Sequence, residues 1–246
     1  MSEGMPTKNQ ELHGMVPDSC PVALVLIDVI NDMEFPGGER LAGHALLAAR
    51  RIAELKRRAR EAGVPVIYCN DNFGRWRSDF HEVVEHVMGD GVRGEPIGQM
   101  LKPSRDDYFV LKPKHSAFYA TTLDTLLDYL GARRLILCGF SGDVCVLFSA
   151  GDAYMRDFHL HVPADCAASI SADENKRALA YMRRVLKVNT SPSDRLDLEA
   201  LIRKHEEGDS GGEDETADEE EAADGGETED GGETEDGGDG GNDGED

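Results

Sequence analysis

A single cysteine stands where the chain could use a thiol as a nucleophile. Cys145 follows the Gly-rich segment 139–143, which comes directly after an apolar run, and helical periodicity begins at Val146. Free N–H groups and the dipole at a helix N-terminus favour an anion. This position therefore predicts a thiol biased toward thiolate, beside N–H groups able to hold an oxyanion. The alternative interpretation is that Cys145 is a small core residue, as unpaired cysteines commonly are.

Two charged residues end other apolar segments. Asp28 stands near the end of segment 22–29, and Lys112 ends segment 108–112. Both segments have the composition of buried strands, which have no packing use for a charged side chain. The carboxyl ends of parallel strands form one edge of an open sheet, where ligands bind. The sequence therefore predicts that a carboxylate, an ammonium and a thiol meet at one sheet edge.

The elements that must position these residues alternate between strand and helix patterns. Apolar runs predict strands at 22–29, 64–70, 108–112, 134–137 and 159–162, with a short sixth strand near Val188. Helical periodicity predicts helices at about 41–62, with Leu47, Ile52 and Leu55 toward the core, and at 122–130, 146–155 and 171–186. This order predicts a three-layer α/β/α fold, in which helices cover both faces of a mostly parallel sheet.

These segments resemble the isochorismatase-like cysteine hydrolases, the superfamily that includes isochorismatases, nicotinamidases and N-carbamoylsarcosine amidases. The resemblance covers roughly residues 21–188 and rests on three motifs in the family's order. The motifs are Leu26-Ile27-Asp28-Val29-Ile30-Asn31-Asp32, Val110-Leu111-Lys112-Pro113-Lys114-His115-Ser116-Ala117-Phe118 and Gly139-Phe140-Ser141-Gly142-Asp143-Val144-Cys145-Val146. The pairs Asp152-Ala153 and Ala164-Asp165 also fit the family pattern. The resemblance implies a Rossmann-like, isochorismatase-type fold.

The same resemblance implies a catalytic triad of Asp28, Lys112 and Cys145. In that chemistry the thiolate attacks a carbonyl or imidate carbon and forms a thioester-like intermediate. Asp28 would accept the thiol proton, return it to the leaving amine and activate water, while Lys112 would favour both anions. The family also has a cis peptide before the cysteine. It falls at Phe140-Ser141 here, and would direct the N–H groups of Ser141 and Cys145 at the oxyanion.

The family pattern also bears on the substrate. Isochorismatases cleave a vinyl ether and do not need the cysteine, so Cys145 favours hydrolysis of a small amide, ureido or related C–N bond. Isochorismatase or nicotinamidase activity is the alternative within the family. Loop residues after the strands are expected to line a small, partly aromatic pocket: Phe35, Asn72, Phe73, Trp76, Phe118 and Tyr119. Arg75 and Arg77 could bind a substrate carboxylate, face solvent or lie at a subunit interface.

We expect no metal and no other cofactor. Nicotinamidases carry an Asp-x-His pair after the second strand, and here the corresponding residues are Asp71-Asn72-Phe73. His81 and His86 are five residues apart in a helical segment, which suits shared ligation poorly, so we expect both at the surface.

Other motifs offer competing interpretations. Lys114 is an alternative to Lys112, but it lies further into the loop, where a solvated charge is the expected state. The segment 89–94 matches a dinucleotide fingerprint without the strand that should precede it. Ser141, Asp165 and His205 stand in the chain order of a serine triad, although the segment lacks the final glycine of the serine-hydrolase turn. A different class of function is a non-catalytic binding protein on the same fold.

Composition bounds the remaining possibilities. Residues 206–246 contain 21 acidic and no basic side chains, which leaves 28 acidic and 26 basic residues in 1–205. We therefore expect an N-terminal extension at 1–20, a hydrolase domain at 21–205, and a disordered acidic tail at 206–246 that would suit a high-salt cytoplasm. Nucleic-acid binding is disfavoured because the tail repels phosphates and no basic stripe is present.

Cysteine usage and hydropathy indicate the compartment. The five cysteines, an odd number without paired spacing, indicate a reducing environment: Cys20, Cys69, Cys138, Cys145 and Cys166. The sequence shows no N-terminal signal segment and no apolar run of roughly 18 residues, so it predicts no membrane span. We expect a cytoplasmic homo-oligomer that acts on a small molecule.

Overall fold

The computed structural model describes residues 19–72 and 79–206. Within these ranges, strands and helices alternate along the chain as the sequence predicts. The strands are β1 (Val22–Ile27), β2 (Val66–Asp71), β3 (Tyr108–Lys112), β4 (Arg134–Phe140), β5 (His159–His161) and β6 (Ala167–Ala168). The helices are α2 (Gly38–Glu61), α3 (Phe80–Gly89), α4 (Glu95–Met100), α5 (Leu123–Leu130), α6 (Leu147–Tyr154), α7 (Ala172–Val185) and α8 (Leu198–Glu206).

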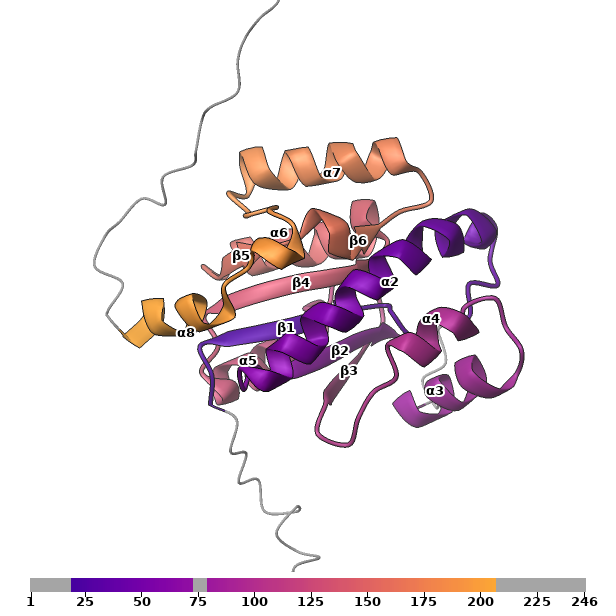
Figure 1. Ribbon diagram of the computed structural model, residues 1–246, viewed down its shortest axis with the longest axis horizontal. Coiled ribbons are helices and arrows are strands. Elements are labelled where there is room, and N and C mark those ends of the chain that lie inside the picture. Colours follow the sequence, from indigo (N-terminus) through magenta and orange to yellow (C-terminus); the bar gives the residue numbers. More distant parts are fainter. Residues whose placement is uncertain (1–18, 73–78, 207–246) are drawn as a thin grey trace, which may run out of the picture. The chain divides into compact units, whose positions relative to one another are not determined.

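The strands form one parallel sheet in the order β3-β2-β1-β4-β5, and β6 pairs with β4 next to it (Figure 1). Ile27 lies opposite Cys69 on one side and Gly139 on the other. Asp71 lies opposite Lys112 at the end of β3. Because the register aligns the carboxyl ends of four strands, the residues that follow them are brought to one edge.

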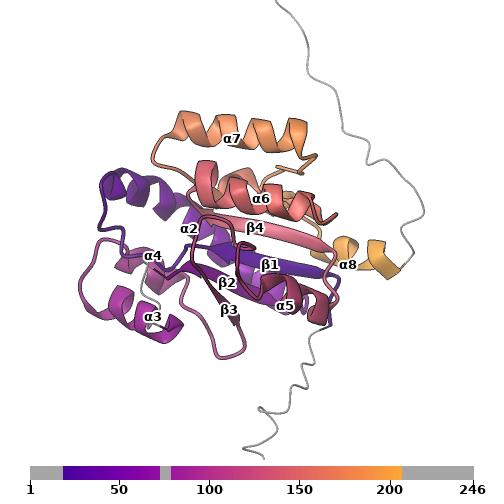
Figure 2. The same ribbon diagram turned by 180° about the vertical axis from the view of Figure 1, so that it is seen from behind.

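Helices cover both faces of this sheet, which confirms the three-layer α/β/α prediction. Alternate residues of β1 point to opposite faces: Leu24 belongs to the core cluster that includes residues of α2, α3, α4 and α8, and Val25 belongs to the cluster that includes residues of α5, α6 and α7. The two views from opposite sides show one helix group in front of the sheet and the other behind it (Figures 1 and 2). Every residue of β1 is fully buried, so the strand is apolar throughout and does not alternate with polar residues.

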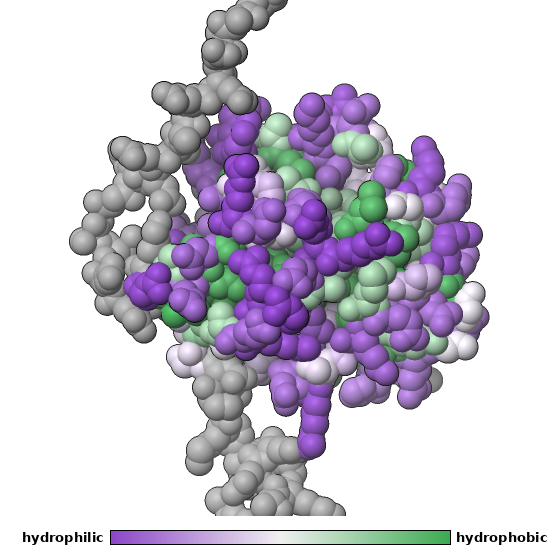
Figure 3. Space-filling view, in the orientation of Figure 1, coloured by the Kyte–Doolittle hydropathy of each residue, from purple (hydrophilic) through white to green (hydrophobic). Residues whose placement is uncertain are grey.

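Helix α2 begins and ends close to the predicted limits, but one of its predicted core residues is wrong. Ile52 and Leu55 are buried, whereas Leu47 is 65% exposed. The buried stripe instead runs through Ala45 and Ala49, and Leu47 lies outside the 3.6-residue period that this stripe follows. Hydrophilic side chains cover most of the described surface on the face shown in Figure 3.

The structure corrects the expected elements at three places. The sixth strand is not near Val188: among the described residues, Asn189 forms an isolated parallel bridge with His161 there and no named strand. The sixth strand is Ala167–Ala168, which is too short to give a strand pattern. The helix predicted from Val146 begins at Leu147, after a π-helical turn at Gly142–Val146. Helices α4 and α8 were not predicted.

The chain divides into two units, Met1–Asp209 and Ser210–Asp246. The predicted N-terminal extension lies outside the described residues apart from Ser19 and Cys20, and so does the predicted tail apart from Glu206. Their predicted disorder stays a prediction. Among the helices of the described ranges, none combines the length and apolar character needed to cross a membrane.

Candidate active site

Asp28, Lys112 and Cys145 converge at the carboxyl edge of the sheet. The Lys112 ammonium lies 2.8 Å from Asp28 Oδ2 and 3.8 Å from Cys145 Sγ. The Asp28 carboxyl and the Cys145 thiol are also close enough for each to shift the pKa of the other. A proton acceptor, a fixed cation and a thiol are therefore in mutual contact, as nucleophilic attack by sulfur requires.

The backbone around Asp28 directs its carboxylate into the site. Asp28 has a φ of 53°, in the left-handed region, directly after the last residue of β1. Its N–H donates to the Cys69 carbonyl at 3.0 Å, and its Oδ1 accepts the Asp71 N–H at 2.7 Å. On the other side β4 approaches closely, because a Cβ on Gly139 would lie 2.0 Å from the Ile27 carbonyl oxygen. Glycine at position 139, with a φ of 134°, therefore permits the close packing that places Asp28.

Lys112, and not Lys114, occupies the cation position. The Lys112 side chain is fully buried, and its ammonium also lies 3.2 Å from the Lys114 carbonyl oxygen and 3.8 Å from Asp71 Oδ2. Lys114 is exposed and contributes its backbone alone to this contact. A buried ammonium is strongly unfavourable unless it is paired, so the Asp28 carboxylate is what allows Lys112 to be charged inside the protein.

Burial and charge act in opposite directions on the two ionic groups. Burial raises the pKa of the Asp28 carboxyl, and the positive charge of Lys112 reduces that rise without cancelling it. Burial lowers the pKa of the Lys112 ammonium, but the negative charge of Asp28, with further contributions from the Cys145 sulfur and from Asp71, outweighs this effect, so the pKa of Lys112 is raised overall. A carboxyl group with a raised pKa is a better proton acceptor than an ordinary aspartate.

The thiol of Cys145 is not predisposed to ionise. Burial raises its pKa to about 12, and the negative charge of Asp28 adds to the rise. Lys112 and a backbone hydrogen bond from Ser141 lower the pKa, but they do not outweigh the first two effects. The expectation of a thiol biased toward thiolate is therefore wrong. Cys145 rests as a thiol, and attack by sulfur requires transfer of its proton.

The turn that carries Cys145 is held from several sides. The peptide bond Phe140-Ser141 is cis, and the Ser141 carbonyl accepts the Val144 and Val146 N–H groups at 3.2 and 3.1 Å. In α6, Ser149 Oγ donates to the Cys145 carbonyl at 2.7 Å and accepts the Ala117 N–H at 2.9 Å. Ser149 thus connects the nucleophile turn to the loop that follows Lys112.

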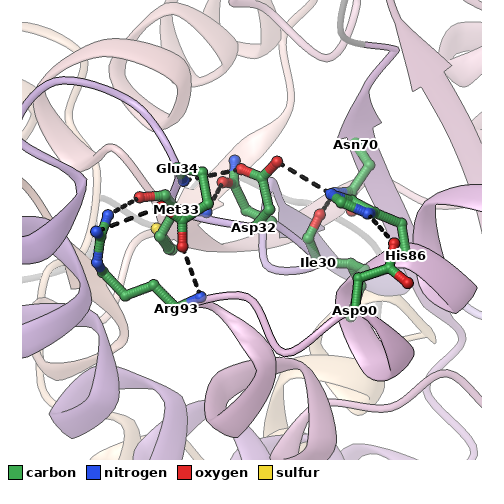
Figure 4. Close-up of polar contacts among 9 residues, drawn as sticks. Ile30, Asp32, Met33, Glu34, Asn70, His86, Asp90 and Arg93 are labelled. Atoms are coloured by element: carbon green, nitrogen blue, oxygen red, sulfur yellow. Dashed lines mark hydrogen bonds and ion pairs between the residues drawn. The ribbon is translucent and has the colours of Figure 1, made fainter.

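Ion pairs join the loop after Asp28 to α3 and to the turn between α3 and α4 (Figure 4). His86 of α3 lies between two carboxylates, 3.2 Å from Asp32 Oδ2 and 2.7 Å from Asp90 Oδ2. Arg93 pairs with Glu34 of the loop at 3.3 Å, and its N–H donates to the same carboxylate at 2.9 Å. The hydrogen bond to Asp90 and, to a smaller extent, the hydrogen bond to Asp32 raise the pKa of His86. These pairs fix the segment between Asp28 and α2.

The predicted substrate-binding residues are scattered. Phe118 is 4% exposed and packs against the Phe158 ring, so core packing accounts for it. Asn72 is buried, with its N–H donating to the Lys112 carbonyl at 3.1 Å, while Phe35 and Tyr119 are exposed. Phe73, Trp76, Arg75 and Arg77 lie outside the described residues. Contact of any of these side chains with substrate stays a prediction.

Sequence reasoning missed His115, an exposed residue beside the Cys145 thiol. Its Nδ1 lies 3.8 Å from Cys145 Sγ, and its ring centroid is 5.8 Å from that of Phe148. His115 stands three residues after Lys112 in the same motif, which is the signal that could have identified it. Ser149, one helical turn after Cys145, was missed because serine within a helix gives no functional pattern.

The competing motifs have other roles in the structure. Asp165 accepts hydrogen bonds from the Ser193 N–H and hydroxyl at 2.8 and 2.7 Å, and the Ser141 hydroxyl donates to Asp143. These partners leave no Ser141–Asp165 pair. Gly89 ends α3 and does not follow a strand.

The Asp71-Asn72-Phe73 sequence lacks the histidine of the Asp-x-His metal pair, so its donor set does not fit that metal. Across residues 19–72 and 79–206, no cluster of three or more His, Cys, Asp or Glu side chains is arranged to hold a metal ion.

Comparison with known proteins gives consistent matches. The model of the Isochorismatase domain matches residues 22–193. The chain is 43% identical over 164 residues to the uncharacterized isochorismatase family protein YaaI of Bacillus subtilis, which covers 67% of this chain and 90% of that protein. It is 28% identical over 168 residues to maleamate amidohydrolase of Pseudomonas putida, a match that covers 64% of this chain and 76% of that protein. The crystal structure of N-carbamoylsarcosine amidase from Thermoplasma acidophilum superimposes with a TM-score of 0.55 at 26% sequence identity. The superposition covers 72% of this chain and 98% of that one.

Proposed function

The chain belongs to the isochorismatase family of hydrolases, and we propose that it is a cysteine-dependent hydrolase of a small amide, ureido or related C–N bond. The observation that carries this proposal is the position of the Lys112 ammonium, 2.8 Å from the Asp28 carboxylate and 3.8 Å from the Cys145 sulfur. Two similar proteins, maleamate amidohydrolase and N-carbamoylsarcosine amidase, are amide-cleaving by name, which supports the bond type.

In the first half of the reaction, Asp28 takes the proton of the Cys145 thiol as sulfur attacks the carbonyl carbon. Lys112 offsets the negative charge that sulfur carries during attack. The carbonyl oxygen becomes an oxyanion, which N–H groups of the nucleophile turn, at Ser141 and Cys145, would stabilise. The C–N bond then breaks, the proton on Asp28 passes to the leaving nitrogen, and a thioester remains on Cys145.

In the second half, water replaces the departed amine. Asp28 takes a proton from the water molecule, and the water oxygen adds to the thioester carbon. The C–S bond breaks, the Cys145 sulfur recovers its proton from Asp28, and the carboxylic acid leaves. The site thus returns to its starting protonation, with a thiol at Cys145 and a carboxylate at Asp28.

Hydrolysis of a panel of small amides, ureides and carbamoyl compounds tests this proposal, with ammonia release as the measurement. We expect the wild-type protein and a Lys114→Ala control to hydrolyse the same members of the panel, and Cys145→Ala to hydrolyse none. Turnover retained by purified Cys145→Ala would exclude the mechanism. Selective binding of panel members without turnover in the wild-type protein would favour the non-catalytic binding function.

A further inference from the structure

A polar cluster of Asn175 and Ser169 packs against the nucleophile turn. Asn175, in the first turn of α7, donates from Nδ2 to the Ala167 carbonyl at 3.1 Å. Its Oδ1 accepts the hydroxyl of Ser169 at 2.9 Å, and Ser169 Oγ in turn accepts the Asp143 N–H at 3.1 Å. The chain of contacts ends on the nucleophile turn, two residues before Cys145.

The direction of each hydrogen bond in this cluster is determined. The Ala167 carbonyl can only accept, so the amide of Asn175 must present Nδ2 to it and Oδ1 to Ser169. The single hydroxyl proton of Ser169 is then committed to Asn175, which leaves the oxygen lone pairs for the Asp143 N–H. Ser169 is 1% exposed, so water does not compete for these contacts.

Close packing adds a steric constraint to the polar one. A Cβ on Gly142 would lie 2.1 Å from Asn175 Oδ1 and 3.3 Å from Ser169 Oγ. The backbone of Gly142 is thus in direct contact with both side chains. The Asp143 carboxylate also accepts the Ser141 hydroxyl, which connects the cluster to the residue after the cis peptide. The turn 141–145 therefore has no room to shift toward α7.

We propose that Asn175 and Ser169 are positioning residues that direct the N–H groups of turn 141–145 at the developing oxyanion. This inference rests on the proposed function and deepens it, because it assigns the support of the oxyanion site. Stabilisation of an oxyanion depends on N–H donors held at about 2.7–3.1 Å from its final position, so a small rotation of the turn weakens it. Alkylation of the same thiol by iodoacetamide forms no oxyanion, so it does not depend on those donors.

Two reactions of Cys145 separate this role from general support of the fold. Acylation by p-nitrophenyl acetate transfers the acetyl group to sulfur and releases p-nitrophenolate through an oxyanion, whereas iodoacetamide alkylates sulfur and releases iodide. In Ser169→Ala we expect acylation to slow by roughly tenfold or more, toward the loss seen when an oxyanion donor is removed, with alkylation nearly unchanged. Asn175→Asp, which keeps the side-chain volume but loses the donor to Ala167, should give the same pattern. Lys176→Ala, an exposed neighbour in α7, should change neither rate.

Amide hydrogen exchange of the peptide that contains residues 141–145 gives a readout independent of turnover. Exchange should be faster in Ser169→Ala and Asn175→Asp than in Lys176→Ala. Equal loss of acylation and alkylation, or unchanged acylation in both variants, would overturn the inference, and so would exchange equal to that of the control. Absence of Cys145 acylation in the wild-type protein would instead contradict the proposed function, and the exchange comparison would still decide the role of the two residues.

Discussion

The reactivity of Cys145 is set by two neighbours of opposite charge. Burial and the Asp28 carboxylate raise the pKa of the thiol to about 12, while Lys112 lowers it. Asp28 therefore opposes ionisation of the resting thiol, although in the proposed mechanism it accepts the thiol proton during attack. The two roles of Asp28 make opposite predictions for two reactions of the same sulfur.

Replacing Asp28 by Asn should abolish hydrolysis and speed up alkylation. The amide cannot accept the thiol proton or activate water, so turnover should be lost. It also removes the negative charge that raises the pKa of Cys145, so more thiolate is present at pH 8 and iodoacetamide should react faster. Labelling of Cys145 followed by mass spectrometry measures the second effect. Slower alkylation, or hydrolysis at a rate near that of wild type, would reassign the base.

Replacing Lys112 by Ala should have the opposite effect on alkylation. Loss of the ammonium removes the charge that lowers the pKa of Cys145, so the thiol should react more slowly with iodoacetamide. Removal also leaves the buried Asp28 carboxylate without its partner, and we expect a loss of stability of about 3–5 kcal/mol in urea unfolding. Lys114→Ala, the exposed control, should change both quantities little. A larger loss of alkylation rate and stability in Lys114→Ala than in Lys112→Ala would mean that the cation has been assigned to the wrong lysine.

At the scale of elements, strands and their ends were predictable and the supports between them were not. The strands that lead to Asp28 and Lys112 are apolar runs followed by or ending on a charged residue. This pattern is local in the sequence, so it was enough to predict both strands and their charged ends. Leu47 was misplaced because the apolar stripe of α2 is mostly alanine, which gives a weak pattern. The contacts of Asn175 with Ala167 and Ser169 join a helix to the segment after β6, and no local sequence pattern reveals them.

The ion pairs of the loop after β1 predict a pH-dependent contribution to stability. Asp90 and Asp32 raise the pKa of His86 in the folded state. The pairs of His86 with these carboxylates therefore contribute fully to the free energy of unfolding below the unfolded pKa of about 6.5. This contribution to stability is lost as the pH rises through the pKa of His86 in the folded state. His86→Gln should therefore lower the urea midpoint at pH 6 and leave it unchanged at pH 9. His81→Gln, at an exposed position on the same helix, is the control. An equal loss for His86→Gln at both pH values would mean that the ring acts by packing and not by charge.

At the scale of the whole molecule, charge is divided unequally along the chain. Residues 1–205 are close to neutral with 28 acidic and 26 basic side chains, while 206–246 carry 21 acidic ones. The site residues and every described strand come before the acidic segment. Function and solubility are therefore expected to depend on different parts of the chain.

Removing residues 207–246, just after α8, should leave turnover per active site unchanged at moderate salt. The truncated protein should precipitate at a lower protein concentration, because mutual repulsion between the acidic segments is lost. Turnover and solubility against protein concentration are the measurements. Loss of turnover with the fold preserved would mean that the acidic segment contributes to the active site or to a partner subunit.

The most direct test of the account is to trap the thioester on Cys145. The protein should be quenched in acid during turnover of p-nitrophenyl acetate, or of a hydrolysed member of the amide panel, and digested for mass spectrometry. We predict one acyl group on the peptide that contains Cys145, none in Cys145→Ala, and the same labelling in Lys114→Ala as in wild type. An acyl group on another residue, or turnover by Cys145→Ala without any adduct, would contradict the account.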